Sequence, residues 1–413
     1  MNREKRNTKI FYLILLIFLF LPSCLFIHKI GGAFIYKPNE LQNNISEGAK
    51  KLIQEAYLEI EPKDLMDYHV HIVGLGANDS GAFVNPEMQS WFHPIKRFKF
   101  NVYLSASNVV DLQNADKEYV SRLTDLVGSI KNHGKFIILG FDKNYDIEGN
   151  VNLEKTEFYA PNDYIYQIYE KYPDYFLPMI SINPYRKDAI TELEKWAKSG
   201  VKFIKWLPNS MGIDASSVWI EPFYQKMKEY NMILLTHTGE EQAVDAEEDQ
   251  MLGNPLLFRK PLGMGIRVIM AHCASLGKCI DIDGESNKMV NCFDLFLRLM
   301  DEKKYNGLLF GDISAQVQFN RLPVPIATIL ERIDLHPRLV NGSDYPLPAI
   351  NAILRTKDLV KDGFITEDER EFLNEIYNYN PLLFDFVLKR TLKHPTTKQK
   401  LSPSVFMKNP GLE

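Results

Sequence analysis

Eight short β-rich runs alternate with helical stretches beyond Asp64, and this alternation restricts the possible folds more than any other feature of the chain. Strands that alternate with amphipathic helices are typical of βαβ units and a parallel sheet. Eight such units in one chain predict an α/β fold, a (β/α)8 TIM barrel. The predicted strands cover residues 67–74, 135–141, 176–183, 201–208, 232–239, 266–273, 307–314 and 339–346.

Helical segments fit between and before these runs. Residues 188–198 show helical spacing and end before Gly200, a typical position for a glycine at a helix C-terminus. Residues 45–58 predict a first helix, which Ser46 can cap. Residues 100–107 fit a strand or a helix, and we assign them to a long insertion after the first strand, 74–133. Loops at that face of a barrel commonly carry recognition elements.

The chain of 413 residues is long enough for one barrel with extensions. Its net charge of −5 is small and no dense basic tract follows the N-terminus, so a nucleic-acid partner is not expected. The four cysteines are too few and too clustered to hold a domain of this size together, and they indicate little about the redox compartment.

The N-terminus carries a targeting signal. Residues 1–9 are basic, and residues 10–27 contain no charge, which is just long enough for a transmembrane helix. The basic flank predicts a cytoplasmic N-terminus and a catalytic domain on the non-cytoplasmic side of the membrane. Two alternatives stay open: a lipoprotein modified at Cys24, or a secreted protein with a cleaved signal segment.

The domain organisation follows from these segments. We predict a basic cytoplasmic N-terminus, a transmembrane anchor or signal segment, a tether with a first helix, the barrel, and a C-terminal tail. Their bounds are 1–9, 10–27, 28–63, 64–390 and 391–413.

Ionisable side chains end several of the predicted strands. His69 and His71 are two residues apart, so they share one face of the first strand and can chelate one metal ion. His237, His272 and Asp344 end the fifth, sixth and eighth runs. Buried ionisable groups are costly unless they are paired or metal-bound. The sequence therefore predicts a metal site at this end of the barrel.

This order of residues resembles the amidohydrolase superfamily over about residues 64–388. The local segments DYHVH, THTGE, MAHC and NGSDYP and the pair Asn380-Pro381 are similar to the amidohydrolase-related subgroup that includes aminocarboxymuconate-semialdehyde decarboxylase. The resemblance implies one divalent ion, zinc by preference, with four ligands and an open position for water. Those ligands would be His69, His71, His237 and Asp344.

The resemblance also implies roles in catalysis. Asp344 would accept the proton of the attacking water as general base, and His272 would orient that water or polarise the electrophile. Asp67 is a candidate acceptor for the N–H of a ligand imidazole. Asp312 ends the seventh run and is a weaker substitute for Asp344, because it lacks the Gly-Ser-Asp-Tyr-Pro context.

Two further residues have open roles. Lys205 lies near the end of the fourth run, where related binuclear enzymes carry a carboxylated lysine that bridges two metals. It fits equally a contact to a substrate carboxylate or a structural role. Glu240 follows His237 in an arrangement similar to adenosine-deaminase-like enzymes, which makes it a possible general acid.

The predicted function is that of a metal-dependent hydrolase that cleaves a C–N or C–O bond of a small molecule, such as an amide, lactone, imide or imine. A non-oxidative decarboxylase or a deaminase on the same barrel is the alternative within the fold. An inactive anchored scaffold or binding module is the alternative from another class. The sequence leaves an oligomer open and does not specify the substrate.

Overall fold

The computed structural model describes residues 36–244, 246–284 and 287–413, and its centre is one eight-stranded parallel sheet. The strand order around the sheet is β1-β3-β7-β8-β9-β10-β13-β14. These strands are Met66–His71, Lys135–Leu139, Phe176–Ser181, Phe203–Trp206, Ile233–Thr236, Arg267–Met270, Leu309–Asp312 and Leu339–Val340. Each lies on one of the eight predicted runs, so the predicted β/α alternation is confirmed.

The sheet closes into a barrel through the segment that follows β14. The amide of Tyr68 on β1 donates to the carbonyl of Asn341, and the amide of His71 donates to the carbonyl of Tyr345. In the opposite direction, the amide of Asp344 donates to the carbonyl of His69 at 2.7 Å. The first and last strands are thereby joined, as a (β/α)8 barrel requires.

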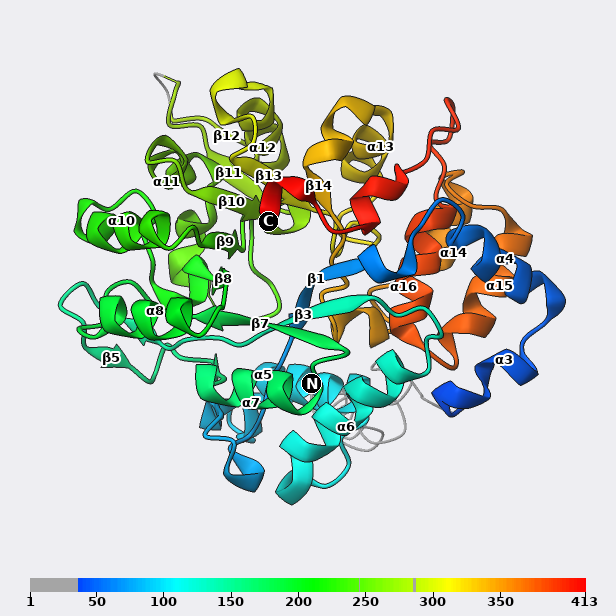
Figure 1. Cartoon of the computed structure of the whole chain (residues 1–413), viewed down its shortest axis with the longest axis horizontal. Helices are drawn as coiled ribbons and strands as arrows, with labels where there is room; N and C mark the ends of the chain where they lie inside the picture. The colour runs from blue at the N-terminus through cyan, green and yellow to red at the C-terminus, as the bar shows by residue number, and fades with distance from the viewer. Residues whose placement is uncertain (1–35, 245, 285–286) are drawn as a thin grey trace, which may run out of the picture.

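Helices surround the barrel, as Figure 1 shows. Those between the strands include α7, α8, α10, α12 and α13, and α14, α15 and α16 follow β14. Their bounds are Asn162–Lys171, Ala189–Lys198, Glu221–Glu229, Cys292–Asp301, Val324–Glu331, Thr356–Lys361, Glu367–Tyr377 and Pro381–Thr391. Helix α8 ends before Gly200, which has a φ of +85°, so the predicted glycine terminus is confirmed.

The first helix and the insertion also follow the sequence. Helix α4, Glu47–Ala56, begins at Ser46, whose hydroxyl accepts from the amide of Ala49. The insertion after β1 contains α5, Pro94–Ala106, and α6, Ala115–Gly128. The segment that fitted either a strand or a helix is therefore helical.

Two apolar layers fill the fold. One inner cluster draws residues from all eight strands, including Tyr68, Leu139 and Leu235, which identifies it as the barrel interior. The other lies between strands and helices and includes Val70 and Ile138. Leu412 belongs to the inner cluster, and Figure 1 shows the C-terminal segment beside β10, β13 and β14.

A β-bulge in β1 changes the predicted side-chain directions. The pairing with β3 shifts between Asp67 and Val70, so two residues of β1 lie opposite one residue of β3. Tyr68 packs in the barrel interior, while Asp67 accepts from the backbone amides of His69 and Ser343. The prediction that Asp67 accepts an imidazole N–H is therefore wrong.

A disulfide joins two of the cysteines. Cys279 on β11, Lys278–Ile280, is bonded to Cys292, which directly follows the paired strand β12, Met289–Asn291. The bridge fixes the hairpin that follows His272, a local contribution that the sequence analysis did not anticipate. Cys273 is buried and free.

No helix within the described residues has the length and apolarity needed to cross a bilayer. The predicted span, residues 10–27, and Cys24 lie outside the described residues.

Candidate metal centre

A pocket lies at the C-terminal ends of the barrel strands and encloses about 120 Å³. Six predicted site residues line it together: His69, His71, Lys205, His237, His272 and Asp344. They come from or directly after β1, β8, β9, β10 and β14, because parallel strands present their carboxyl ends at one face of a barrel. The structure thus brings together the residues that the sequence placed at separate strand ends.

The backbone is strained where two of these side chains enter the pocket. His272 has a φ of +57° and Asp344 a φ of +61°, in the left-handed region that favours glycine. Each such residue costs on the order of 1–3 kcal/mol, and residues of this kind cluster at functional sites. The turns after β10 and β14 therefore hold these two side chains at a cost in stability.

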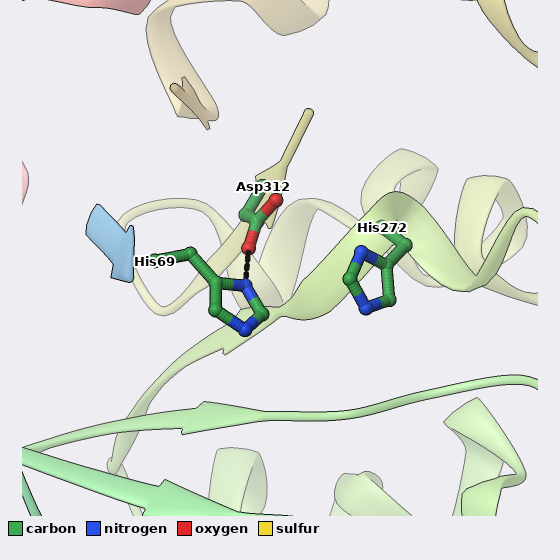
Figure 2. A group of neighbouring side chains, drawn as sticks. All are labelled: His69, His272 and Asp312. Carbon is green, nitrogen blue, oxygen red and sulfur yellow. Dashed lines mark hydrogen bonds and ion pairs between the residues drawn. The ribbon is translucent and has the colours of Figure 1, made fainter. Parts of the chain in front are cut away.

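The His69 imidazole has a fixed protonation state. Its Nδ1 lies 2.6 Å from the buried carboxylate of Asp312. Figure 2 marks this contact with a dashed line. A carboxylate only accepts, so Nδ1 carries the proton and Nε2 presents a lone pair. Asp312 thus does not replace Asp344 but orients a histidine, a role typical of residues behind a metal ligand.

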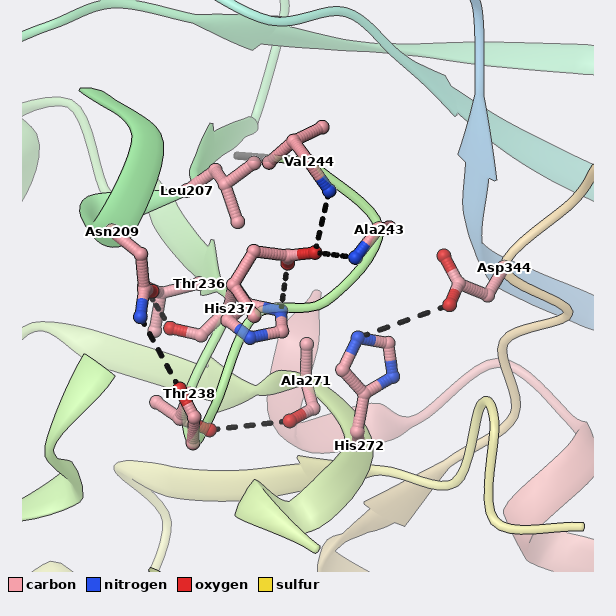
Figure 3. Close-up of polar contacts among 12 residues, drawn as sticks. Leu207, Asn209, Thr236, His237, Thr238, Ala243, Val244, Ala271, His272 and Asp344 are labelled. Carbon is pink, nitrogen blue, oxygen red and sulfur yellow. Dashed lines mark hydrogen bonds and ion pairs between the residues drawn. The ribbon is translucent and has the colours of Figure 1, made fainter. Parts of the chain in front are cut away.

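Two further histidines also have a protein contact at Nδ1. Figure 3 shows both rings, with His272 joined to Asp344 by a dashed line. Nδ1 of His237 lies 3.3 Å from the carboxylate of Glu241, and Nε2 of His237 is buried without a hydrogen-bond partner in the described structure. Nδ1 of His272 lies 2.8 Å from the hydroxyl of Ser314, and its Nε2 lies 3.8 Å from Asp344. In each case the protein contacts Nδ1 and leaves Nε2 for the pocket.

The donor atoms of three residues converge. Nε2 of His69 lies 3.1 Å from Nε2 of His71, and Oδ1 of Asp344 lies 2.9 Å from His71 and 3.5 Å from His69. Zinc ligands about 2.1 Å from one tetrahedral ion lie roughly 3.4 Å apart. The three atoms therefore fit one divalent ion in both spacing and chemistry. The unpartnered Nε2 of His237 is a further nitrogen of suitable chemistry in the same pocket.

The imidazoles are suited to bind metal because they are neutral. Burial, followed by the positive charge of Lys205, lowers the pKa of His69 and of His71 well below the usual range. Burial, followed by the charge of Arg321, does the same for His272. A neutral imidazole is the form that coordinates a cation.

Lys205 lies within the same cluster. Its Nζ donates to Nε2 of His69 at 2.9 Å, and the side chain is buried. Burial lowers the pKa of this amine, while Asp344 and Asp312 oppose the shift. Burial also raises the pKa of Asp344, and Lys205 opposes that shift. The two groups thus lie close enough to affect each other's proton affinity.

The glutamate in the pocket wall is not the one that the sequence singled out. Glu240 lies outside the pocket lining and accepts from the side chain of Gln242. Glu241 lines the pocket, contacts His237, and accepts from the amides of Ala243 and Val244. The two glutamates are consecutive in the turn after β9, and only the side chain of Glu241 faces the pocket. No sequence pattern distinguishes them.

Arg321 is a pocket residue that the sequence reasoning missed. It is 7% exposed, and its guanidinium donates to the hydroxyl of Ser275 at 2.9 Å. Its Nε is buried without a partner, and no carboxylate of the described residues lies within 4.0 Å of it. It follows β13 in a segment without regular structure, so no periodicity points to it.

Comparisons with known proteins give likenesses in structure alone. No family model matches the chain, and no curated protein matches its sequence. A 5-carboxyvanillate decarboxylase from Sphingomonas paucimobilis superposes with a TM-score of 0.44 at 10% identity, over 75% of this chain and 96% of that one.

Two further structures have a TM-score of 0.39. One is a putative 2-pyrone-4,6-dicarboxylic acid hydrolase from Pseudomonas putida, 15% identical over 69% of this chain and 83% of that one. The other is an N-isopropylammelide isopropylaminohydrolase from Burkholderia multivorans, 12% identical over 83% and 77%.

Proposed function

We propose that this chain is a metal-dependent hydrolase of the amidohydrolase type, which cleaves a C–N or C–O bond of a small molecule. The convergence of His69, His71 and Asp344 within 2.9–3.5 Å carries the proposal. These residues and His237 would hold the ion, for which zinc is the best match to imidazole and carboxylate ligands. When bound, the ion supplies Lewis acidity, which polarises a carbonyl group and acidifies water.

The side chains of the pocket would handle the protons. Burial raises the pKa of the Asp344 carboxylate, which brings it closer to that of a general base acting near neutral pH. His272 lies 3.8 Å from the other side of this carboxylate and would orient the reacting groups. Glu241, rather than Glu240, lies where an acid could reach a substrate beside His237.

Metal analysis of the purified full chain tests the proposal. After reconstitution with zinc, we expect about one equivalent per chain, and the Asp344→Asn variant should bind at least roughly tenfold more weakly. Asp334→Asn is the matched control, because Asp334 is exposed and paired with Arg332. Less than about 0.3 equivalents in the unaltered chain would refute a metalloenzyme.

Lys205 decides between one and two ions. A carboxylated Lys205 would bridge two metals, with His69, His71 and Asp344 at one and His237 and His272 at the other. We take a single ion as the base case. Two equivalents that fall to one or none in Lys205→Ala would establish the bridge, whereas about one equivalent in both proteins would leave Lys205 a substrate contact or a structural residue.

Arg321 favours a second candidate function. A buried cation without a carboxylate partner is costly, and a substrate carboxylate would relieve that cost. Non-oxidative decarboxylation of such a substrate would use the same ion and pocket. Binding of benzoate and of benzamide should be compared in the zinc-loaded chain and in Arg321→Gln. Preference for benzoate that disappears in the variant would support an acidic substrate, and an unchanged preference would oppose it.

We also propose that the barrel lies on the non-cytoplasmic side of a membrane, held by residues 10–27. The disulfide between Cys279 and Cys292 supports this location, because disulfides persist in oxidising compartments. Protease added to intact spheroplasts should degrade the barrel if it is external. A chain protected until the cells are lysed would contradict the proposed location.

A further inference from the structure

The first turn of α5 exposes the end of an apolar stripe. Ile95, Phe98, Val102 and Ala106 are spaced by three, four and four residues, so they lie along one side of the helix. Val102 and Ala106 are buried in the core, whereas Ile95 is 74% exposed and Phe98 is 48% exposed. The stripe therefore continues beyond the part of the protein that covers it.

The loop before α5 enlarges this apolar surface. Trp91 is 70% exposed and Phe92 is 91% exposed. The guanidinium of Arg97 lies 3.8 Å from the centre of the Trp91 ring. Single exposed apolar side chains are ordinary, but four large ones within eight residues indicate a contact surface. We call Trp91, Phe92, Ile95 and Phe98 the α5 patch.

Basic side chains lie among these apolar ones. Lys96, Arg97 and Lys99 alternate with Ile95 and Phe98 along the first two turns of the helix. Lys96 is paired with Glu87 at 2.8 Å and with the buried Glu157 at 2.9 Å. Tryptophan and phenylalanine beside lysine and arginine are the composition of segments that lie in the interface of a bilayer. Arg97 and Lys99 would face phosphate headgroups while the rings enter the acyl boundary.

The α5 patch lies beside the pocket. Tyr103, two turns further along α5 from Ile95, lines the pocket, and its hydroxyl donates to the carbonyl of Ala243. Lys99 donates to the carbonyl of Gln242, which also lines the pocket. One helix therefore carries both a wall of the pocket and the exposed apolar surface.

The other end of α5 lies near the start of the described chain. Tyr36 and Lys37 line one surface hollow together with Asn108 and Val110, which follow α5. A helix of 13 residues is about 20 Å long. Residues 28–35 span up to roughly 28 Å when extended. The chain between the apolar run 10–27 and Tyr36 is thus long enough for a bilayer that holds the run to reach the α5 patch.

We infer that the α5 patch docks on the surface of the bilayer that holds residues 10–27, with the mouth of the pocket beside the lipid headgroups. The inference goes beyond the proposed function, since it concerns where the pocket lies and not what reacts in it. A lipid on Cys24 would bring the bilayer equally near. The partner is a phospholipid bilayer with an anionic component, which the charges of Arg97 and Lys99 match.

Tryptophan fluorescence provides a direct test. The chain has four tryptophans, none of them in residues 1–35. Trp196 and Trp206 are buried, whereas Trp91 and Trp219 are 70% and 74% exposed. The full chain is reconstituted in vesicles of phosphatidylglycerol and brominated phosphatidylcholine, whose bromine atoms quench only residues at the membrane. Trp91→Phe and Trp219→Phe form the matched pair.

We expect the brominated lipid to quench the emission of the unaltered chain and of Trp219→Phe alike, and to quench Trp91→Phe at least about twofold less. A Phe92→Ser/Ile95→Ser variant, which keeps Trp91, should lose quenching to a similar extent while binding zinc like the unaltered chain. Equal quenching of the two tryptophan variants would overturn the inference.

A second copy of the chain is the competing occupant of this surface. Sedimentation of the full chain in detergent distinguishes it. A dimer that the Phe92→Ser/Ile95→Ser change converts to a monomer, together with Trp91 that brominated lipid does not quench, would show that the patch joins two chains. That result would also overturn the inference.

Discussion

The site depends on which nitrogen of each imidazole carries the proton. Asp312 fixes the proton of His69 on Nδ1, Glu241 contacts the same atom of His237, and Ser314 that of His272. These partners come from two segments, the end of β13 and the turn after β9, and each leaves an Nε2 for the pocket. The groups behind the histidines therefore matter nearly as much as the histidines themselves.

Replacing Asp312 by asparagine tests this arrangement. The amide is a weaker acceptor and can present its NH2 group to Nδ1, which would move the proton to Nε2 and block coordination. We expect the Asp312→Asn variant to bind zinc about 10- to 100-fold more weakly, as measured by competition with a chelating dye. Asp301→Asn, which alters an exposed partner of Arg332, should bind zinc normally. Unchanged affinity in Asp312→Asn would contradict the role.

Asp67 should make stability depend on pH. Burial raises the pKa of its carboxyl to about 7, although the amides of His69 and Ser343 and the charge of Lys389 oppose the shift. Between about pH 4 and pH 7 the folded chain keeps a proton that the unfolded chain has lost, so Asp67 lowers the free energy of unfolding as the pH rises through this window. The Asp67→Asn variant lacks this loss.

Denaturant unfolding of the two metal-free proteins at several pH values measures the effect. The free energy of unfolding of Asp67→Asn minus that of the unaltered chain should increase between about pH 4 and pH 8, by on the order of 4 kcal/mol. The asparagine oxygen can still accept from both amides, so the variant should fold. A difference that stays constant across this range would show that the carboxyl titrates normally.

Among the elements, the segment after β14 has little room for a larger side chain. It closes the barrel and carries Asp344, and the space beside Gly342 is occupied: a methyl group there would lie 2.6 Å from Cβ of His69. The Gly342→Ala variant should therefore displace His69 and reduce zinc binding by more than about tenfold. Gly263→Ala is the control, because nothing lies within 4 Å of its added methyl. If Gly342→Ala binds zinc as tightly as the unaltered chain, the segment after β14 can shift to make room for the methyl group.

The elements also show how far sequence reasoning reaches. The eight strands were predictable because each is a short apolar run bounded by helical spacing, and the histidines at their ends followed from position alone. The bulge in β1 was not predictable from the sequence, because it arises from pairing with β3, which lies more than sixty residues further along the chain. Arg321 could not be recognised as a pocket residue for a related reason. Its burial depends on the residues around the pocket and on no local sequence pattern.

For the whole molecule, metal binding and stability should be linked. The donor atoms come from both sides of the seam between β1 and the segment after β14, so an ion bound there would join the two edges of the barrel. Zinc at 100 times its Kd should raise the free energy of unfolding by about 2.7 kcal/mol. Calcium, which prefers oxygen ligands, should not. Thermal unfolding with zinc, with calcium and with EDTA measures this, and identical curves would exclude the linkage.

Because of the bulge in β1, the number of residues in this strand determines which side chains point into the barrel and the pocket. In a regular strand, side-chain direction depends only on whether a position is odd or even, so Tyr68 and the two histidines would face opposite ways. One extra residue changes that parity partway along the strand. The same six residues, Met66–His71, can then supply both apolar side chains to the barrel interior and histidines to the pocket above it. If any single residue of this strand is deleted, we expect that either the apolar side chains no longer fill the barrel interior or the two histidines no longer point into the pocket.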